Sequence, residues 1–371
     1  MKRLNIWKDN IFYRIYEFRS KSAVLSLDDS LAKSVGGFET IESAVKNGAN
    51  VIVDITSGNR GCSLRKALDS YNIDKSLEER VKAVHIVDEN KLSYHFSMQS
   101  KDSIIYVSEE MKNKVLLPED RISIAEECMV KEYGADFKIR GIIDVTDYIP
   151  QEYVRQAREI LLDKINNKHL DILGIPVGGG NTFISFYQAL NQLRNDGYKI
   201  NTKLVGFVPV DEHPIFHNFL SNRVIGNKEE NSIVNYNPKS LADKLSCPYT
   251  DLLPELKEAE KNGHQFIELG NGMIESALWF AVAYANEMRK YLSEINNSEI
   301  SQKYALALAN LHYLAHSEEY SSSVAFALIN NNIAKKVGIK EYDNVGIFIT
   351  GNGFYSCVKT FFNSIGTNDR I

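Results

Sequence analysis

The sequence from 173 to 190 reads Leu173-Gly-Ile-Pro-Val-Gly-Gly-Gly-Asn-Thr-Phe-Ile-Ser-Phe-Tyr-Gln-Ala-Leu190, and it contains the clearest structural signal in the chain. Apolar residues run from Ile172 to Val177 and stop at three glycines. An amphipathic segment with apolar residues at helical spacing then begins at Thr182. This order predicts a strand, a short turn and the N-terminus of a helix.

The turn has features that suit a phosphate group. Gly178, Gly179 and Gly180 have no Cβ, so their backbone can adopt positive φ and approach a ligand closely. Asn181 or Thr182 is expected to cap the helix, whose first N–H groups have no partner within the helix. A helix N-terminus of this kind attracts phosphate. A tight glycine turn without a ligand is the alternative, and this stretch alone does not separate the two.

Composition narrows the class of protein. The chain has 371 residues, enough for about two domains. Its net charge of −5 and its lack of a Lys/Arg cluster argue against a nucleic-acid or membrane-surface role. Four scattered cysteines suggest neither a zinc site nor a disulfide framework. Because we find no secretory or membrane-spanning apolar run, we expect a cytoplasmic protein.

Strand and helix patterns alternate along the chain. The alternation predicts βαβ units, an α/β fold and mostly parallel sheet. Strands are expected at 11–16, 23–27, 50–55, 82–87, 103–107, 138–145, 172–177, 203–210 and 344–350. Helices are expected at 31–47, 62–71, 108–115, 121–133, 147–166, 182–193, 273–292 and 304–315. The polar stretch 222–240 is the best candidate for a mobile loop.

Two further stretches contain candidate functional residues near the N-terminus. Lys33 lies in the first turn of the helix expected from Leu31, where the helix dipole disfavours a cation. A lysine that gives up its proton readily suits Schiff-base chemistry, and a solvated surface lysine is the alternative. The run Thr56-Ser57-Gly58-Asn59-Arg60-Gly61, here called the asparagine loop, follows a β-branched strand. Its donors can hold a carboxylate, although it can also be a plain polar loop.

The last predicted strand ends at Thr350, followed by Gly351-Asn-Gly353. Open α/β sheets bind ligands at the carboxyl ends of their strands, so Thr350 is a further candidate.

The order of these stretches resembles that of the fold type II pyridoxal-phosphate enzymes, which include tryptophan synthase β chains, cysteine synthases and threonine synthases. Thr56-Ser-Gly-Asn59 matches the asparagine loop of that family residue for residue, and Lys33 precedes it at the family's spacing. Ile175-Pro-Val-Gly-Gly-Gly-Asn-Thr182 and Ile349-Thr-Gly-Asn-Gly353 resemble two threonine synthase motifs. The surroundings of Lys33, Leu27-Asp-Asp-Ser-Leu-Ala-Lys-Ser-Val35, depart from the family pattern.

The resemblance implies pyridoxal 5′-phosphate as cofactor and a role for each candidate. Lys33 would bind the cofactor covalently and move the Cα proton. Asn59 would contact the cofactor, and its phosphate would lie on Gly178, Gly179, Gly180, Asn181 and Thr182. Thr56, Ser57 and Gly58 would bind the substrate carboxylate. Arg60 departs from the cysteine synthases, which have a small threonine there; its planar guanidinium suits a second carboxylate, a phosphate or a sulfonate of the substrate, and a surface arginine paired with Asp54 or solvent is the alternative. Thr350 would contact the pyridine nitrogen through a neutral hydroxyl.

The resemblance also implies the reaction class. A hydroxyl does not keep the ring nitrogen protonated as an aspartate would, so β- or γ-elimination or replacement on an amino acid is favoured over transamination. Threonine-synthase-like chemistry is the first expectation. Synthesis of cysteine or cysteate type is one alternative, and a non-catalytic cofactor-binding protein is the other. The expected assembly is a homodimer, with a smaller domain at 34–155 and a larger one formed by 1–33 and 156–371.

Overall fold

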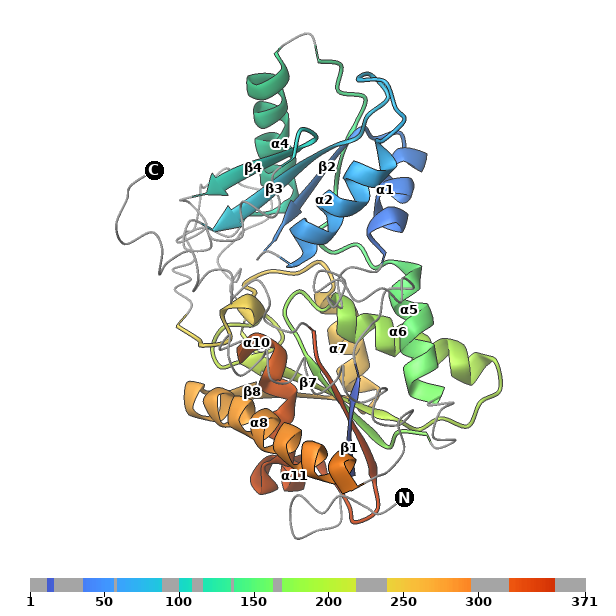
Figure 1. Ribbon diagram of the computed structural model, residues 1–371, viewed down its shortest axis with the longest axis vertical. Coiled ribbons are helices and arrows are strands. Elements are labelled where there is room, and N and C mark those ends of the chain that lie inside the picture. The colour runs from blue at the N-terminus through green and yellow to red at the C-terminus, as the bar shows by residue number, and fades with distance from the viewer. Residues whose placement is uncertain are drawn as a thin grey trace.

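The chain forms two parallel β-sheets, each flanked by helices, in a computed structural model (Figure 1). The structure describes residues 12–16, 36–56, 59–88, 100–108, 116–134, 137–162, 169–217, 239–294 and 320–350. Every strand pair within these ranges is parallel. The α/β architecture expected from the sequence is therefore confirmed.

The first sheet contains four strands in the order β4-β3-β2-β5. Its strands are β2 (Val51–Ile55), β3 (Lys82–Asp88), β4 (Ser103–Ser108) and β5 (Ile142–Asp144). Its helices are α1 (Gly37–Lys46), α2 (Asn59–Tyr71) and α4 (Pro118–Tyr133). Alternate residues of a strand face opposite sides, so Ile52 packs with α1 and α2 while Val51 and Val53 pack with α4. Both faces are covered, which explains why β2 is apolar except for the buried Asp54.

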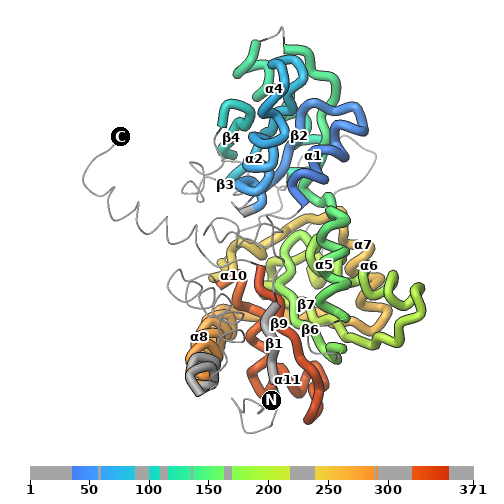
Figure 2. The backbone as a smooth tube through the Cα atoms, turned by 45° about the vertical axis from the view of Figure 1, so that its right-hand side comes forward, coloured from blue at the N-terminus to red at the C-terminus, as the bar shows by residue number. Residues whose placement is uncertain are grey.

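The second sheet contains five strands in the order β1-β9-β6-β7-β8. Its strands are β1 (Phe12–Tyr16), β6 (Ile172–Pro176), β7 (Lys203–Pro209), β8 (Gln265–Leu269) and β9 (Asn344–Phe348). The helices on one face are α5 (Gln151–Leu162), α6 (Asn181–Asn195) and α7 (Leu253–Lys261). The other face packs against α8 (Asn271–Glu294), α11 (Asn331–Val337) and the 3-10 helix η5 (Val324–Ile329). The short helix α10 (Tyr320–Ser323; Figure 2) and the 3-10 helix η4 (Asp243–Leu245) complete this half.

Helix α5 belongs with the second sheet. Its buried residues Tyr153, Val154 and Ala157 share one apolar cluster with α6 and β6. The sequence-based boundary at 155 falls inside this helix. We therefore propose that the two domains meet in the segment 145–150, here called the connector, rather than within α5.

Each sheet has one strand at which the direction of winding reverses. In the first sheet β2 lies between β3 and β5, and in the second sheet β6 lies between β7 and β9. Parallel α/β sheets bind ligands beyond the carboxyl ends of strands at such positions. The asparagine loop follows β2, and the glycine triplet follows β6. The fold therefore puts both sequence motifs at the positions where ligands are expected.

Some element boundaries differ from those expected. The strand expected at 138–145 pairs only at 142–144, because the Asn50 side chain bonds the main chain of Lys138 and Arg140 instead. The helix expected at 147–166 begins at Gln151, directly after Pro150. Helix α1 begins at Gly37 after Gly36, whose φ is 80°. The elements expected at 23–27 and 304–315 lie outside the described residues, as do most of the polar stretch 222–240 and most of the helix expected at 108–115, whose first residue ends β4.

Within the described ranges, no helix combines the length and the apolar character needed to span a bilayer.

Gly174 in β6 provides a test of the packing between β6 and η5. A Cβ on Gly174 would lie 2.6 Å from Leu328 Cδ1 and 3.2 Å from Phe207 Cε2, both in fully buried side chains. We expect Gly174→Ala to lower the free energy of unfolding by about 1–3 kcal/mol, the usual cost of overpacking. Urea unfolding measures this change. In the control Gly272→Ala in α8 the new Cβ has no neighbour within 4 Å, so no loss is expected. Equal effects in the two variants would contradict the packing described.

Candidate functional site

The connector contacts the helices that follow both motifs. Arg60, in the first turn of α2, donates hydrogen bonds from Nη1 to the Thr146 carbonyl at 2.9 Å and from Nη2 to the carbonyls of Val145 and Tyr148. Asn181, the first residue of α6, donates from Nδ2 to the Tyr148 carbonyl at 3.0 Å. One short segment thus joins the asparagine loop of the first sheet to the glycine loop of the second.

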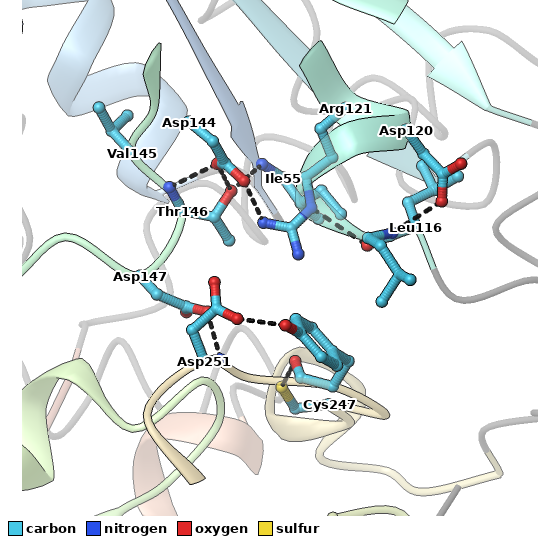
Figure 3. A network of polar contacts seen from close by, with 12 residues as sticks. Ile55, Leu116, Asp120, Arg121, Asp144, Val145, Thr146, Asp147, Cys247 and Asp251 are labelled. Carbon is cyan, nitrogen blue, oxygen red and sulfur yellow. Dashed lines mark hydrogen bonds and ion pairs between the residues drawn. The ribbon is translucent and has the colours of Figure 1, made fainter. Parts of the chain in front are cut away.

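Polar contacts hold the start of the connector against the first sheet (Figure 3). Thr146 donates from Oγ1 to Asp144 at 2.6 Å and accepts the Ile55 N–H at 3.1 Å, so it ties the ends of β5 and β2 together. Arg121 of α4 pairs with Asp144 at 2.5 Å. Its guanidinium also lies 5.9 Å from the ring centroid of Tyr249, which precedes α7 in the other half. Both sheets therefore contribute to this network.

The glycine loop, Gly178–Gly180, approaches its neighbours closely. A Cβ on Gly178 would lie 3.4 Å from the Lys244 carbonyl, and one on Gly179 would lie 3.2 Å from Asp147 Oδ1. Gly180 has φ 101° and is itself the N-cap of α6. The side-chain cap expected from Asn181 or Thr182 is therefore wrong, because a glycine occupies the capping position and the Asn181 amide bonds the connector instead.

The N–H groups of this loop are available to a ligand. Among the described residues, none accepts a hydrogen bond from the main-chain N–H of Gly179, Gly180, Asn181 or Thr182. Their carbonyl side is occupied, since Gly178 and Gly179 accept from His213 and Thr250. Backbone N–H groups at a helix N-terminus favour an anion. Sequence reasoning missed His213 and Thr250, which belong to no local motif.

Thr350 lies directly beyond β9, the neighbour of β6. Its Oγ1 is 3.3 Å from Ser322 Oγ in α10, and the three serines of α10 are buried. Ser321 Oγ accepts the Lys244 N–H at 3.2 Å, and Lys244 in turn lies against Gly178. The hydroxyl expected to face a ring nitrogen is thus part of the wall that borders the glycine loop.

The asparagine loop is described in part. Thr56 is buried, and its Oγ1 accepts the Gly61 N–H at 3.0 Å, which supports the first turn of α2. Lys33, Ser57 and Gly58, as well as the side chain of Asn59, lie outside the described residues. Their roles stay predictions.

Asp147 places a carboxyl group beside the glycine loop. Its Oδ2 accepts the Asp251 N–H at 2.9 Å. Burial raises the pKa of Asp147, and the nearby Asp251 carboxylate adds to the rise, while the Asp251 N–H and the Arg121 guanidinium oppose it. A raised pKa makes this carboxyl easier to neutralise, which lessens its repulsion of an anion at the loop.

The sequence suggested no metal ligands, yet three side chains with possible ligand atoms gather where β7 and β8 end. Single ligand atoms of Asp211, His217 and Glu268 all lie within 4.8 Å of one another. His217 Nε2 lies 2.8 Å from Glu268 Oε1, so an ion pair or hydrogen bond accounts for this arrangement without a metal.

Arg60 provides a test of the connector. We expect Arg60→Ala to lower the free energy of unfolding by about 1.5–3 kcal/mol, because hydrogen bonds from a charged donor to three carbonyls are lost. Chemical denaturation measures this loss, and Arg65→Ala, which removes a half-buried i,i+4 pair with Asp69, is the control. An unfolding free energy equal to that of the control variant would contradict the connector role.

The same variant tests the predicted contact with a substrate anion. A selective loss of activity on O-phosphoserine relative to O-acetylserine would support that contact. Equal losses on the two substrates would assign Arg60 to the connector alone.

The comparisons with known proteins give matches by structure but none by sequence. No protein-family profile and no curated protein matches this sequence. Solved structures do match. An O-acetylserine-dependent cystathionine β-synthase from Helicobacter pylori has a TM-score of 0.55 at 12% identity, over 93% of this chain and 89% of that one. The protein has the fold of the fold type II pyridoxal-phosphate enzymes.

Two other solved structures agree with this assignment of fold. A diaminopropionate ammonia lyase from Escherichia coli has a TM-score of 0.55 at 12% identity, over 91% of this chain and 79% of that one. A pyridoxal 5′-phosphate-dependent aspartate racemase has a TM-score of 0.52 at 17% identity, over 87% and 80%. The fold expected from the order of the motifs is confirmed, although the sequence identities are only 12% to 17%.

Proposed function

We propose that this protein is a pyridoxal-phosphate-dependent enzyme that acts at the α, β or γ carbon of an amino acid. The observation that carries the proposal is the glycine loop at the reversal point of the second sheet, whose N–H groups have no acceptor within the part of the chain that the structure describes. The solved structures of this fold described above are a synthase, a lyase and a racemase, which supports the same broad class. Within that class we favour β- or γ-elimination or replacement, as the sequence motifs imply.

The residues of the site fit this cofactor. A phosphate group would meet a row of main-chain N–H donors at Gly179–Thr182, at the N-terminus of α6, for which no described residue is an acceptor. The hydroxyl pair of Thr350 and Ser322 offers a neutral partner at the carboxyl end of the adjacent strand. When bound, the cofactor supplies an electron sink for the bonds at the substrate Cα.

The side chains and loops of the protein would then bind and orient the cofactor and the substrate and transfer the proton. The amine of Lys33 would hold the cofactor and take the proton from the substrate Cα. Thr56, Ser57, Gly58 and Asn59 would orient the substrate carboxylate and the cofactor from the first sheet. The connector would hold the two loops together, since Arg60 and Asn181 both donate to the Tyr148 carbonyl. A small amino-acid substrate, a homodimer and a cytoplasmic location complete the proposal and rest on the sequence.

A substrate panel tests the proposal. The purified protein is incubated with pyridoxal phosphate and then with O-phospho, O-acetyl and O-succinyl amino acids, with and without a thiol nucleophile. We expect visible absorbance that borohydride removes, and a keto acid or a replaced amino acid as product. Racemisation of aspartate or serine without other products would replace elimination as the reaction. Bound cofactor without any product would favour the non-catalytic alternative, and no bound cofactor would overturn the proposal.

A further inference from the structure

Two side chains from different elements hold the carbonyl groups of the glycine loop. His213, which follows β7, donates from Nε2 to the Gly178 carbonyl at 2.7 Å. Thr250, which precedes α7, donates from Oγ1 to the Gly179 carbonyl at 2.5 Å. Both side chains are buried, at 0% and 4% exposure. Consecutive peptide groups of the loop are therefore fixed by contacts made far along the chain.

The direction of each hydrogen bond is determined by a second contact. The Ile215 N–H donates to His213 Nδ1 at 3.2 Å, so the ring proton must be on Nε2. The Leu252 N–H donates to Thr250 Oγ1 at 3.1 Å, which leaves the hydroxyl proton for Gly179. Each side chain thus accepts from the N–H two residues ahead and donates to the loop. The same local arrangement occurs twice around one loop.

The imidazole acts as a neutral donor. Burial lowers the pKa of His213 to about 4, against opposing contributions from the Gly178 carbonyl and the Glu268 carboxylate. The ring is therefore uncharged at neutral pH and contributes a fixed hydrogen bond rather than a positive charge.

The two hydrogen bonds orient the opposite side of the loop. A trans peptide group is planar, and its C=O and N–H point in opposite directions. Holding the carbonyls of Gly178 and Gly179 therefore turns the N–H groups of Gly179 and Gly180 away from His213 and Thr250. Glycine has no side chain to restrict these rotations. Without the two donors, the loop could adopt several conformations in which these peptide groups point in different directions.

We propose that His213 and Thr250 are positioning residues that set the glycine loop to bind the phosphate group of the cofactor. The proposal rests on the proposed function and adds the residues that preorganise its anion site. It assigns neither residue a contact with the phosphate itself. Their effect should therefore depend on whether the ligand has a phosphate group.

The test compares pyridoxal phosphate with pyridoxal, which lacks the phosphate. Dissociation constants are measured by fluorescence quenching for the wild type, Thr250→Val and His213→Phe. We expect each variant to bind pyridoxal phosphate about threefold to tenfold more weakly, the range for one neutral hydrogen bond, and pyridoxal with unchanged affinity. Thr250→Ser and His213→Gln keep a donor, and both should regain part of the affinity.

His264→Gln is the matched control. His264 is also a buried histidine with a pKa lowered to about 4 by burial, and its Nδ1 accepts the Leu204 N–H near the start of β7. Any general loss of stability should appear in this control without a preference between the two ligands.

The possible outcomes separate the two proposals. A wild type that binds neither ligand would refute the proposed function. A wild type that prefers pyridoxal phosphate, with Thr250→Val and His213→Phe weakening both ligands equally or neither, would refute the positioning role alone. If those variants do not fold, Thr250→Ala and His213→Ala, which also lack a donor, take their place, because a positioning role requires a donor-free variant to lower the preference for pyridoxal phosphate over pyridoxal and a purely structural role does not.

Discussion

Replacing Lys33 by alanine is expected to abolish covalent attachment of pyridoxal phosphate and to lower turnover by about 10²–10⁴-fold, the usual contribution of a general base. The reason is chemical: alanine has no amine to bond the cofactor or to accept the Cα proton. Lys33 is also the lysine that precedes Asn59 at the spacing seen in the family. Borohydride reduction of the wild type, followed by peptide mass spectrometry, locates the modified lysine, and turnover is measured on the same preparations.

Lys46→Ala is the control for this prediction. Lys46 is exposed in the last turn of α1, and its replacement should leave both cofactor attachment and turnover unchanged. An adduct on Lys21 or Lys46 in the wild type would show that Lys33 has been assigned wrongly. The fold and the glycine loop would be unaffected by that result.

Replacing Thr350 by aspartate is expected to shift the reaction from elimination towards transamination. A carboxylate at the carboxyl end of β9 would favour a protonated ring nitrogen, which the neutral hydroxyl does not. A charged hydrogen bond is worth about 1.5–3 kcal/mol, so the ratio of the two products should change by roughly tenfold to a hundredfold. Product analysis and the absorption spectrum of the bound cofactor measure the change.

Thr350→Ser keeps the hydroxyl and should leave the product ratio as in the wild type. Ser322→Ala removes the neighbouring hydroxyl, 3.3 Å from Thr350 Oγ1, and tests whether the pair acts together. An unchanged spectrum and product ratio in Thr350→Asp would mean that residue 350 does not contact the ring.

The regular elements were largely predictable because they depend on local patterns. The apolar run at 172–177 and the amphipathic run at 182–193 correspond to β6 and α6, since side-chain periodicity follows directly from backbone geometry. The bounds of the strand expected at 138–145 were wrong because a side chain far away in the sequence hydrogen-bonds its main chain. Asn50 bonds the backbone at 138 and 140, and this contact is invisible in the residues of the expected strand.

In the candidate site, too, the residues of local motifs were predictable and the contacts between distant residues were not. Motif residues such as Gly178–Gly180 and Thr56 lie where their motifs predict, because a loop between a parallel strand and its helix must lie at the carboxyl edge of the sheet. Arg60 was expected to face a substrate, yet in the structure its guanidinium donates to carbonyls of the connector. A substrate role for Arg60 would add to these contacts, and it stays a prediction.

The sequence by itself determined the parallel α/β architecture, the order of the motifs and hence the fold, because each of these depends on residues close together in the chain. Only the tertiary structure decided which side chains support the motifs. His213 and Thr250 lie 35 and 71 residues from the glycines that they bond, and Arg60 lies 85 to 88 residues from its carbonyl partners. A histidine or threonine has many possible partners, and packing of the strands and helices selects one. Contacts between residues so far apart in the chain leave no local pattern in a single sequence. The geometry of the site is therefore visible only in the folded structure.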